Sequence, residues 1–312
     1  HTRFNHAIGA LHLTIQAIEV LRSKGVAISE EEANAVFIAI LLHDIGHGPF
    51  SHTLEHTLLN IHHEELSLHF MEALNEEFKG ELDLAIEIFK GKYHRNFLHQ
   101  LISSQLDMDR LDYLNRDTFF TGVSEGVIGY DRIIKMLNVV GDNLVVEEKG
   151  LYSIEKFLIA RRIMYWQVYL HKTVVAAEVM LIKVFERAKL LVENGWEPAI
   201  SPALYQILRK PLDSDSFKTA RDQNLKLFAS IDDYDIVMAM KVFAESFDRV
   251  LSFLSNSLLN RNIFRLKFYD DAIEESTKQA WIDLAKEALH LTDEEAAYLV
   301  TVGVESNSTY NR

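Results

Sequence analysis

The stretch His43-Asp44-Ile45-Gly46-His47-Gly48-Pro49-Phe50-Ser51-His52 is the most informative part of this 312-residue sequence. It follows an apolar run, residues 36–42, that is typical of the end of an amphipathic helix. A histidine and a carboxylate buried at such a place are costly unless they are paired or bind a metal ion. Gly46, Gly48 and Pro49 then interrupt the helical pattern. We therefore expect a functional loop or broken helix directly after a buried helix.

The composition favours a mostly helical protein. Hydrophobic residues make up 48% of the chain and charged residues 25%, whereas glycine (13) and proline (4) are scarce. The net charge of −14 argues against nucleic acid as the primary partner, because nucleic-acid-binding proteins neutralise the phosphates with basic side chains. Cysteine is absent, which excludes disulfides, cysteine-bound metals and thiol catalysis.

We expect a cytoplasmic protein with no membrane partner. No apolar run approaches the roughly 20 residues that a membrane span needs. The sequence contains no recognisable signal peptide, although it opens on His1 and the preceding residues are not known.

Helical spacing of apolar residues predicts most of the secondary structure. Helices are expected at 4–22, 33–43, 53–60, 63–75, 82–89, 96–119, 153–193, 236–259 and 274–289, and short strands at 144–147 and 262–269. Ser29 and Glu32 have the spacing of a capping box at the start of the second helix. Three of the four prolines lie within 198–211. They predict a boundary between a catalytic core, 1–195, and a smaller mixed α+β C-terminal region, 196–312, that packs on the core and contributes to oligomer contacts.

Histidine is concentrated near the N-terminus. Ten of the fourteen histidines lie in the first 69 residues, less than a quarter of the chain. Histidine is tolerated on helix surfaces, which is one explanation. The other is a metal site, because an imidazole and a carboxylate side by side, as in His43-Asp44, are ligands for Mn²⁺, Fe²⁺, Zn²⁺ or Mg²⁺.

Adjacent residues cannot encircle an ion, so further ligands must come from elsewhere. His6 lies on the first helix among apolar neighbours, where a lone histidine is more often a core residue. The segment 105–117 carries several acids, and Asp109, Tyr113 and Asp117 share one helical face. Such a run is also typical of a solvated surface. Taken together, His6, His43, Asp44 and Asp109 predict a site with two histidines, two carboxylates and open positions for water and substrate.

The motifs together resemble one family. Four motifs resemble the HD-domain phosphohydrolases, and among them the deoxynucleoside triphosphate triphosphohydrolases: His-Thr-Arg-Phe-Asn-His at 1–6, the stretch at 43–52, His63-Glu64 and Asp-Met-Asp-Arg-Leu-Asp-Tyr-Leu-Asn-Arg-Asp at 107–117. These include bacterial dGTPase-like enzymes and the animal enzyme with a sterile alpha motif. The resemblance implies an HD-domain helical core and one divalent ion per subunit. It also implies hydrolysis of a dNTP at the α-phosphorus, with dGTP as a substrate or effector.

The resemblance also assigns roles to individual residues. His52 is similar to the family's general acid, and Glu55 stands where we would expect the aspartate that orients it. His47 and His63 resemble further catalytic and phosphate-contacting histidines. Residues that resemble contacts to the triphosphate and sugar are Arg3, Arg110, Tyr113, Asp117 and Tyr169. Those that resemble contacts to the phosphates of a nucleotide effector at subunit interfaces are Arg132, Arg261 and Arg265. Many relatives are dimers or tetramers, so we expect a homo-oligomer.

Two other functions remain open from the sequence. The first is another HD-type phosphohydrolase, such as a 5′-nucleotidase or a phosphodiesterase, which shares the His-Asp doublet. The second is a nucleotide sensor without turnover, although such a protein would not need a leaving-group acid.

Overall fold

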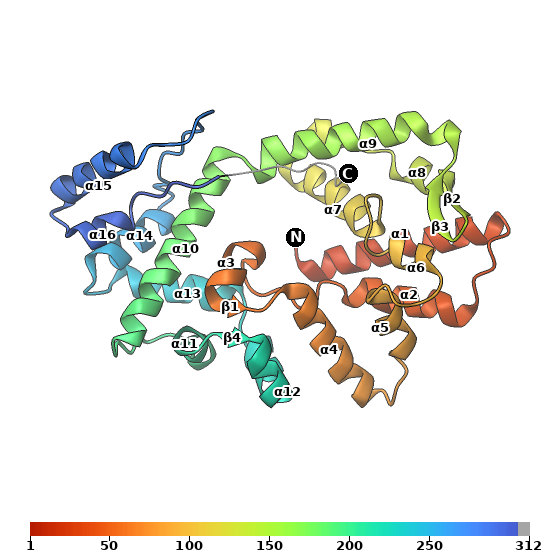
Figure 1. Cartoon of the computed structure of the whole chain (residues 1–312), viewed down its shortest axis with the longest axis horizontal. Helices are drawn as coiled ribbons and strands as arrows, with labels where there is room; N and C mark the ends of the chain where they lie inside the picture. The colour runs from red at the N-terminus through yellow and green to blue at the C-terminus, as the bar shows by residue number, and fades with distance from the viewer. Residues whose placement is uncertain (305–312) are drawn as a thin grey trace. The chain divides into compact units, whose positions relative to one another are not determined.

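The computed structural model describes residues 1–304, and within them the chain is mostly α-helical, as predicted. Sixteen α-helices are accompanied by two small two-stranded sheets, β1 with β4 and β2 with β3 (Figure 1). Within residues 1–304, none of the helices has both the length and the hydrophobicity that a transmembrane span requires.

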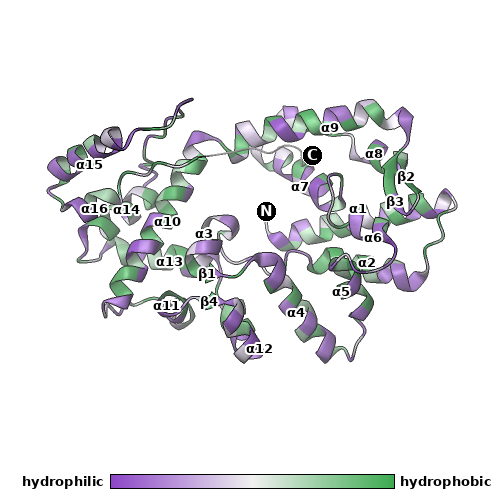
Figure 2. Ribbon diagram, in the orientation of Figure 1, coloured by the Kyte–Doolittle hydropathy of each residue, from purple (hydrophilic) through white to green (hydrophobic). Residues whose placement is uncertain are grey.

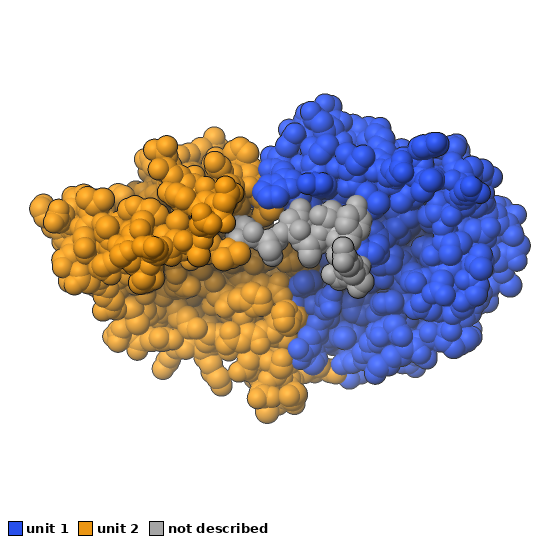
Figure 3. Space-filling view, turned by 45° about the horizontal axis from the view of Figure 1, so that its top comes forward, with its two compact units in different colours: residues 1–46, 63–169, 308–312 blue, residues 47–62, 170–307 orange. Residues whose placement is uncertain are grey.

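The chain forms two compact units (Figure 3). The first unit contains residues 1–46 and 63–169, and the second contains 47–62 and the described chain from 170 onward. The predicted domain boundary at residue 195 stays a prediction.

The elements of the first unit surround one apolar core. In chain order they are α1 (Arg3–Ser23), α2 (Glu30–Leu42), α4 (His63–Glu77), α5 (Asp83–Phe89), α6 (Asn96–Gln100), α7 (Met108–Thr121), α8 (Tyr130–Met136), β2 (Leu137–Val140), β3 (Asn143–Val146), α9 (Leu151–Met164) and a π-helical turn (Tyr165–Tyr169). Short 3-10 turns lie at Ser124–Gly126 and Glu148–Gly150. The predicted strand at 144–147 is confirmed as β3, which pairs antiparallel with β2.

Close helix packing in the first unit brings distant parts of the sequence together. α1 packs against both α2 and α7 (Figure 1). A Cβ atom at Gly9 would lie 2.0 Å from Oδ1 of Asp112, so only glycine fits where α1 meets α7. Figure 2 shows the hydrophobic residues of α2, of which Val36, Ala39 and Ile40 are fully buried. This packing brings the start of α1, the end of α2 and the start of α7 close to one another.

The start of α2 has the predicted capping box. Nitrogen of Glu32 donates to Oγ of Ser29 at 3.0 Å, and nitrogen of Ser29 donates to Oε2 of Glu32 at 2.8 Å. The same carboxylate accepts two hydrogen bonds of 2.8 Å from Arg95, which lies just before α6. Glu32 therefore links the start of α2 to a second part of the first unit.

The second unit is built around α10. Its elements are α3 (Ser51–Leu58), β1 (Leu59–Asn60), α10 (Lys172–Glu193), α11 (Pro202–Arg209), β4 (Leu212–Asp213), α12 (Ser214–Ala229), α13 (Asp233–Ala244), α14 (Arg249–Leu259), α15 (Glu275–Leu289) and α16 (Asp293–Ala297). α10 packs against α3, α11 and α14, and β1 pairs with β4 in parallel. Arg187 of α10 donates to buried Asp248, which also caps α14.

Three predicted helices are interrupted. The helix expected at 96–119 is α6 and α7 with a loop between them, because Asp107 accepts from the nitrogens of Ser104 and Arg110 and begins a new helix. The helix expected at 153–193 ends in the π-helical turn, and His171 caps α10. The helix expected at 236–259 is divided into α13 and α14 by the cap at Asp248.

The strand expected at 262–269 is wrong. These residues form no strand, and nitrogen of Phe264 contacts Sδ of Met180 on α10 instead. The helix expected at 53–60 ends at Leu58, where β1 begins. The helices α8, α11, α12 and α16 were not predicted; α8, α11 and α16 are short, and α12 is polar.

Candidate functional site

His6 is held in the interior of the first unit by two carboxylates of α7. Its side chain is buried, although it lies on the first two turns of α1. Nδ1 donates to Oδ2 of Asp112 at 2.7 Å, and Nε2 lies 3.0 Å from Oδ1 of Asp109. The contact with Asp112 fixes the ring, so Nε2 points toward Asp109.

His43 is arranged in the same way at the end of α2. Its Nδ1 donates to the carbonyl oxygen of Ile40 at 2.6 Å, so its Nε2 is directed away from the helix. This Nε2 is buried and makes no hydrogen bond with any described residue. The nearest carboxylate oxygens are Oδ1 of Asp44 at 3.4 Å and Oδ1 of Asp109 at 3.5 Å.

The four predicted metal ligands therefore lie together in the first unit. One atom each from His6, His43 and Asp109 forms a group whose members are all within 4.8 Å of one another. Asp44 completes the set, with Oδ2 3.8 Å from Nε2 of His6. The predicted substrate residue Arg3 lies beside them, because its Nη1 is 2.6 Å from the same Oδ2.

The carboxylates draw positive charge into this group. Burial lowers the pKa of His6, but Asp109 and Asp112 outweigh it and raise the pKa to about 9. The pKa of His43 is also raised, because Asp109 and Asp44 outweigh its burial. The pKa of Asp109 is lowered, since the two histidines outweigh the effect of burial. The carboxylates thus favour positive charge at the position where the two Nε2 atoms converge, as a cation-binding site requires.

These residues fit a divalent metal ion. Two imidazole Nε2 atoms and two carboxylates converge, and both Nδ1 atoms are already held by other acceptors. Metal-binding histidines in proteins have this arrangement, with the second nitrogen fixed by a carboxylate or carbonyl. The buried Nε2 of His43 has no hydrogen-bond partner among the described residues, and coordination would satisfy it. Imidazole with carboxylate suits Mn²⁺, Fe²⁺ or Zn²⁺.

The first turns of α7 place a cation beside this group. Nε of Arg110 donates to the carbonyl oxygen of Ser104 at 2.7 Å and lies 3.2 Å from Oδ2 of Asp107. Burial, together with the charge of Asp109, raises the pKa of Asp107 to about 7 despite Arg110. Arg110 is half-buried, and its contacts with Ser104 and Asp107 at the start of α7 hold the guanidinium in place.

Further along α7, three predicted substrate residues lie together. The hydroxyl of Tyr169, in the π-helical turn, donates to Oδ2 of Asp117 at 2.5 Å. The rings of Tyr113 and Tyr169 meet edge to face, with centroids 6.4 Å apart. Burial raises the pKa of both tyrosines and also that of Asp117, so the hydroxyls stay protonated.

Two residues of this region were not predicted from the sequence. Asp112 holds His6 and accepts two hydrogen bonds from Arg116, at 2.9 and 2.8 Å. Arg161 of α9 is buried, and its Nε has no hydrogen-bond partner within the described chain. The helical periodicity contained both signals: Asp112 is one turn from Asp109, and Arg161 precedes Tyr165 by four positions.

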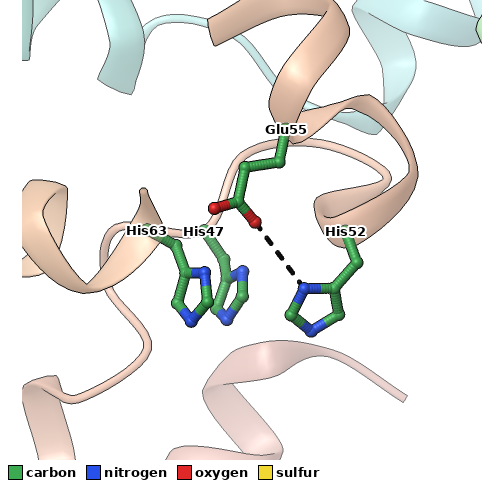
Figure 4. Close-up of side chains that lie close together, drawn as sticks. All are labelled: His47, His52, Glu55 and His63. Atoms are coloured by element: carbon green, nitrogen blue, oxygen red, sulfur yellow. Dashed lines mark ion pairs between the residues drawn. The ribbon is translucent and has the colours of Figure 1, made fainter. Parts of the chain in front are cut away.

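In the second unit, α3 carries His52 and Glu55 one turn apart. Nδ1 of exposed His52 lies 3.6 Å from Oε2 of buried Glu55 (Figure 4). Nδ1 of His47 lies 2.7 Å from Oγ of Ser51, and the rings of His47 and His52 meet edge to face. The backbone before α3 is left-handed at Phe50, whose nitrogen donates to Oδ1 of Asp233. The predicted acid and its predicted orienting carboxylate are thus neighbours.

The remaining predicted residues belong to other elements of the chain. His63 is the first residue of α4 in the first unit. Arg132 of α8 is exposed and donates to the carbonyl oxygen of Lys149. Arg261, with a positive φ of 60°, and Arg265 are exposed in the chain that follows α14. The effector role of these three arginines stays a prediction.

Comparison with known protein families identifies two adjacent segments. The HD domain matches residues 3–117, a range that contains all four predicted metal ligands. The HD associated region matches residues 128–197.

Similar proteins cover most of the chain. A crystal structure of a phosphohydrolase from Bacteroides thetaiotaomicron has 53% sequence identity and a TM-score of 0.93, over 96% of this chain and 74% of that one. The uncharacterized protein YwfO of Bacillus subtilis is 30% identical over 92% of this chain and 66% of its own. The deoxynucleoside triphosphate triphosphohydrolase SAMHD1 homolog of Dictyostelium discoideum is 26% identical over 90% of this chain and 53% of its own. The chain thus spans less than two thirds of the length of these last two relatives.

Proposed function

Because the chain belongs to the HD-domain phosphohydrolase family, we propose that it hydrolyses deoxynucleoside triphosphates to the deoxynucleoside and inorganic triphosphate. The similarity to the Dictyostelium triphosphohydrolase supports this choice among HD-type reactions. dGTP is the first candidate for substrate or effector.

One observation carries the proposal. The two Nε2 atoms of His6 and His43 converge on Oδ1 of Asp109, and α7 continues from Asp109 to Arg110, Tyr113 and Asp117. A single helix thus presents a metal ligand, a cation for phosphate and polar groups for a sugar. This order suits a nucleotide whose phosphates lie at the start of α7 and whose sugar lies further along it.

His6, His43, Asp44 and Asp109 would hold the divalent ion. When bound, it supplies positive charge that polarises a phosphate oxygen and acidifies water. Arg110 adds a guanidinium, which can donate two hydrogen bonds to the phosphate oxygens at once. Arg161 is proposed to contribute the second guanidinium, because a buried Nε without a partner is satisfied by an anion.

His52 is proposed to protonate the leaving group. In the reaction, a water molecule releases a proton to solvent as its oxygen forms a bond to the α-phosphorus, and the bond from phosphorus to the 5′-oxygen breaks. The 5′-oxygen leaves as an alkoxide unless it receives a proton, and histidine can donate one near neutral pH. Glu55, 3.6 Å from Nδ1 of His52, stabilises the protonated ring. His47 and His63 are proposed to contact the phosphates.

Tyr113, Asp117 and Tyr169 are proposed to select the deoxyribose. The hydrogen bond between Tyr169 and Asp117 fixes the carboxylate, and the ring of Tyr113 is adjacent to that of Tyr169. A carboxylate held in this way can accept a hydrogen bond from the 3′-hydroxyl, while the two rings limit the space near the 2′-position.

Product analysis tests the proposal. Each dNTP is incubated with the protein and Mn²⁺, singly and in pairs, and the products are separated by ion-exchange chromatography. We expect deoxynucleoside together with intact triphosphate. Release of a monophosphate or single phosphates would instead establish a 5′-nucleotidase or phosphodiesterase type of reaction. Binding of metal and nucleotide without turnover would establish a sensor.

The paired incubations also test regulation. A homo-oligomer with a nucleotide effector bound near Arg132, Arg261 and Arg265 is proposed from the family resemblance. Turnover of one dNTP only in the presence of another would support an effector, and sedimentation in both conditions would give the oligomeric state. Equal turnover of single and paired nucleotides would contradict the effector.

A further inference from the structure

A second group of metal-ligating side chains lies on α3 and the segment after it. Nδ1 or Nε2 of His56, a nitrogen of His62 and a carboxylate oxygen of Glu55 are all within 4.8 Å of one another. Nδ1 of His62 is 3.6 Å from Oε1 of Glu55, and the rings of His56 and His62 meet edge to face with centroids 5.5 Å apart. These three residues lie in the second unit and include none of the proposed ligands of the first.

The elements α3 and β1 hold the backbone of these three residues in place. Glu55 and His56 are consecutive on α3, whose buried residues Leu54 and Leu58 anchor the helix. After α3 the chain forms β1, which pairs with β4, and buried Ile61 precedes His62. The two imidazoles are exposed while the carboxylate is buried, so an ion can reach the group from solvent past the histidines.

The donor set matches the requirements of zinc. Two imidazoles and one carboxylate, with a water as fourth ligand, are an established ligand combination for Zn²⁺. Ligand atoms at about 2.0–2.1 Å from a tetrahedral ion lie roughly 3.3 Å from one another. The separation of 3.6 Å between His62 and Glu55 is already close to this value, and exposed His56 can rotate.

We propose that Glu55, His56 and His62 form a second, exchangeable metal site, of the class that takes Zn²⁺. Occupation of this site inhibits turnover, an effect that rests on the proposed function. Glu55 is shared: Oε1 faces His62 and Oε2 faces His52. An ion bound to Oε1 would hold the carboxylate toward His56 and His62, which weakens its contact with Nδ1 of His52 and so the orientation of that ring.

Metal stoichiometry tests the site without reference to activity. Metal-free protein is dialysed against Co²⁺, which reports its coordination by visible absorption, and bound metal is counted. We expect two ions per chain in the wild type, one in His56→Ala/His62→Ala, and one in Asp109→Asn. His94→Ala, which removes an exposed histidine elsewhere, is the matched control and should keep two. Two ions in the double variant, or one in the wild type, would overturn the proposal.

Inhibition tests the consequence. In Mn²⁺-loaded protein, added Zn²⁺ should inhibit dNTP hydrolysis, and His62→Ala should keep basal turnover while raising the half-inhibitory Zn²⁺ concentration by about tenfold or more. Equal inhibition of wild type and variant would show that Zn²⁺ acts elsewhere and overturn the regulatory part. If no dNTP is turned over, the proposed function has failed, and the stoichiometry still decides the site.

Discussion

Nδ1 of His6 donates a 2.7 Å hydrogen bond to Asp112, and this contact sets the direction of the other ring nitrogen. Asp112 is itself held by two hydrogen bonds from Arg116, so the carboxylate has little freedom to turn. The same relationship exists at His43, where the carbonyl oxygen of Ile40 is the acceptor. Both histidines are thus oriented before any ion binds, which reduces the conformational entropy that binding costs.

Replacement of Asp112 tests the value of this orientation. In Asp112→Asn the acceptor loses its charge, so the imidazole of His6 becomes less basic and less well oriented. We expect metal affinity to fall by about 10- to 100-fold, measured as retained metal during dialysis against a graded chelator. Asp215→Asn, at an exposed aspartate of α12, is the control and should behave as wild type. Unchanged affinity in Asp112→Asn would show that Asp112 only supports packing.

Loss of a direct ligand should have a larger effect. His43→Ala and Asp109→Ala each remove one of the converging donors, so we expect the ion bound at this first-unit site and the activity both to be lost. Metal content by mass spectrometry and turnover are measured on the same preparation, with circular dichroism as a check of folding. His12→Ala, at an exposed position of α1, should lose neither. Full metal content in Asp109→Ala would exclude this residue from the site.

The proposed acid should separate metal binding from turnover. His52 is exposed and lies in the second unit, whereas all four proposed ligands lie in the first. His52→Ala should therefore keep its metal and lose most turnover, by about 10²- to 10⁴-fold. The measurement is single-turnover hydrolysis of dGTP at saturating enzyme. Wild-type turnover in this variant would show that another group protonates the leaving oxygen.

The sequence predicted the helical class and the grouping of the four proposed metal ligands. Both depend on strong local signals, which are the apolar periodicity of the helices and the dense motif around His43. His6 could be grouped with Asp109 only by combining the motifs and by the family resemblance, because a lone histidine on an apolar helix is more often a core residue. The structure supplies the reason: Gly9 lets α1 approach α7 to a distance that excludes a side chain.

The errors arose where side chains override the helical pattern. Asp107 and Asp248 each cap a helix inside a stretch whose apolar residues continue in helical spacing, and the sequence does not say which of several acids will cap. The alternation at 262–269 predicted a strand, but no described segment pairs with it. Asp112 was not predicted because it is one of several acids in its segment, and its role depends on the contact with His6, 106 positions away in the sequence.

Selection against ribonucleotides depends on the contact between Tyr169 and Asp117. Tyr169→Phe removes a hydrogen bond to a carboxylate, whose contribution is about 1.5–3 kcal/mol, and Asp117 is then free to turn. We expect the ratio of kcat/KM for dGTP to that for GTP to fall by about tenfold or more. Tyr152→Phe, at an exposed tyrosine of α9, should leave the ratio unchanged. An unchanged ratio in Tyr169→Phe would place sugar selection elsewhere.

Glu32 should make the stability of the first unit depend on pH. Burial raises the pKa of this carboxyl, but Arg95, Ser29 and Tyr93 outweigh it and hold the pKa below its ordinary value of 4.5. A lowered pKa in the folded state stabilises the fold above the unfolded-state pKa, and this contribution is lost as the pH falls through the folded-state pKa. We therefore expect Glu32→Gln to lower the free energy of unfolding by about 2 kcal/mol at pH 7, and the difference from wild type to shrink below about pH 4.5. Urea unfolding at pH 7 and pH 4, with exposed Glu31→Gln as the control, measures both effects, and a difference that grows on acidification contradicts the assignment.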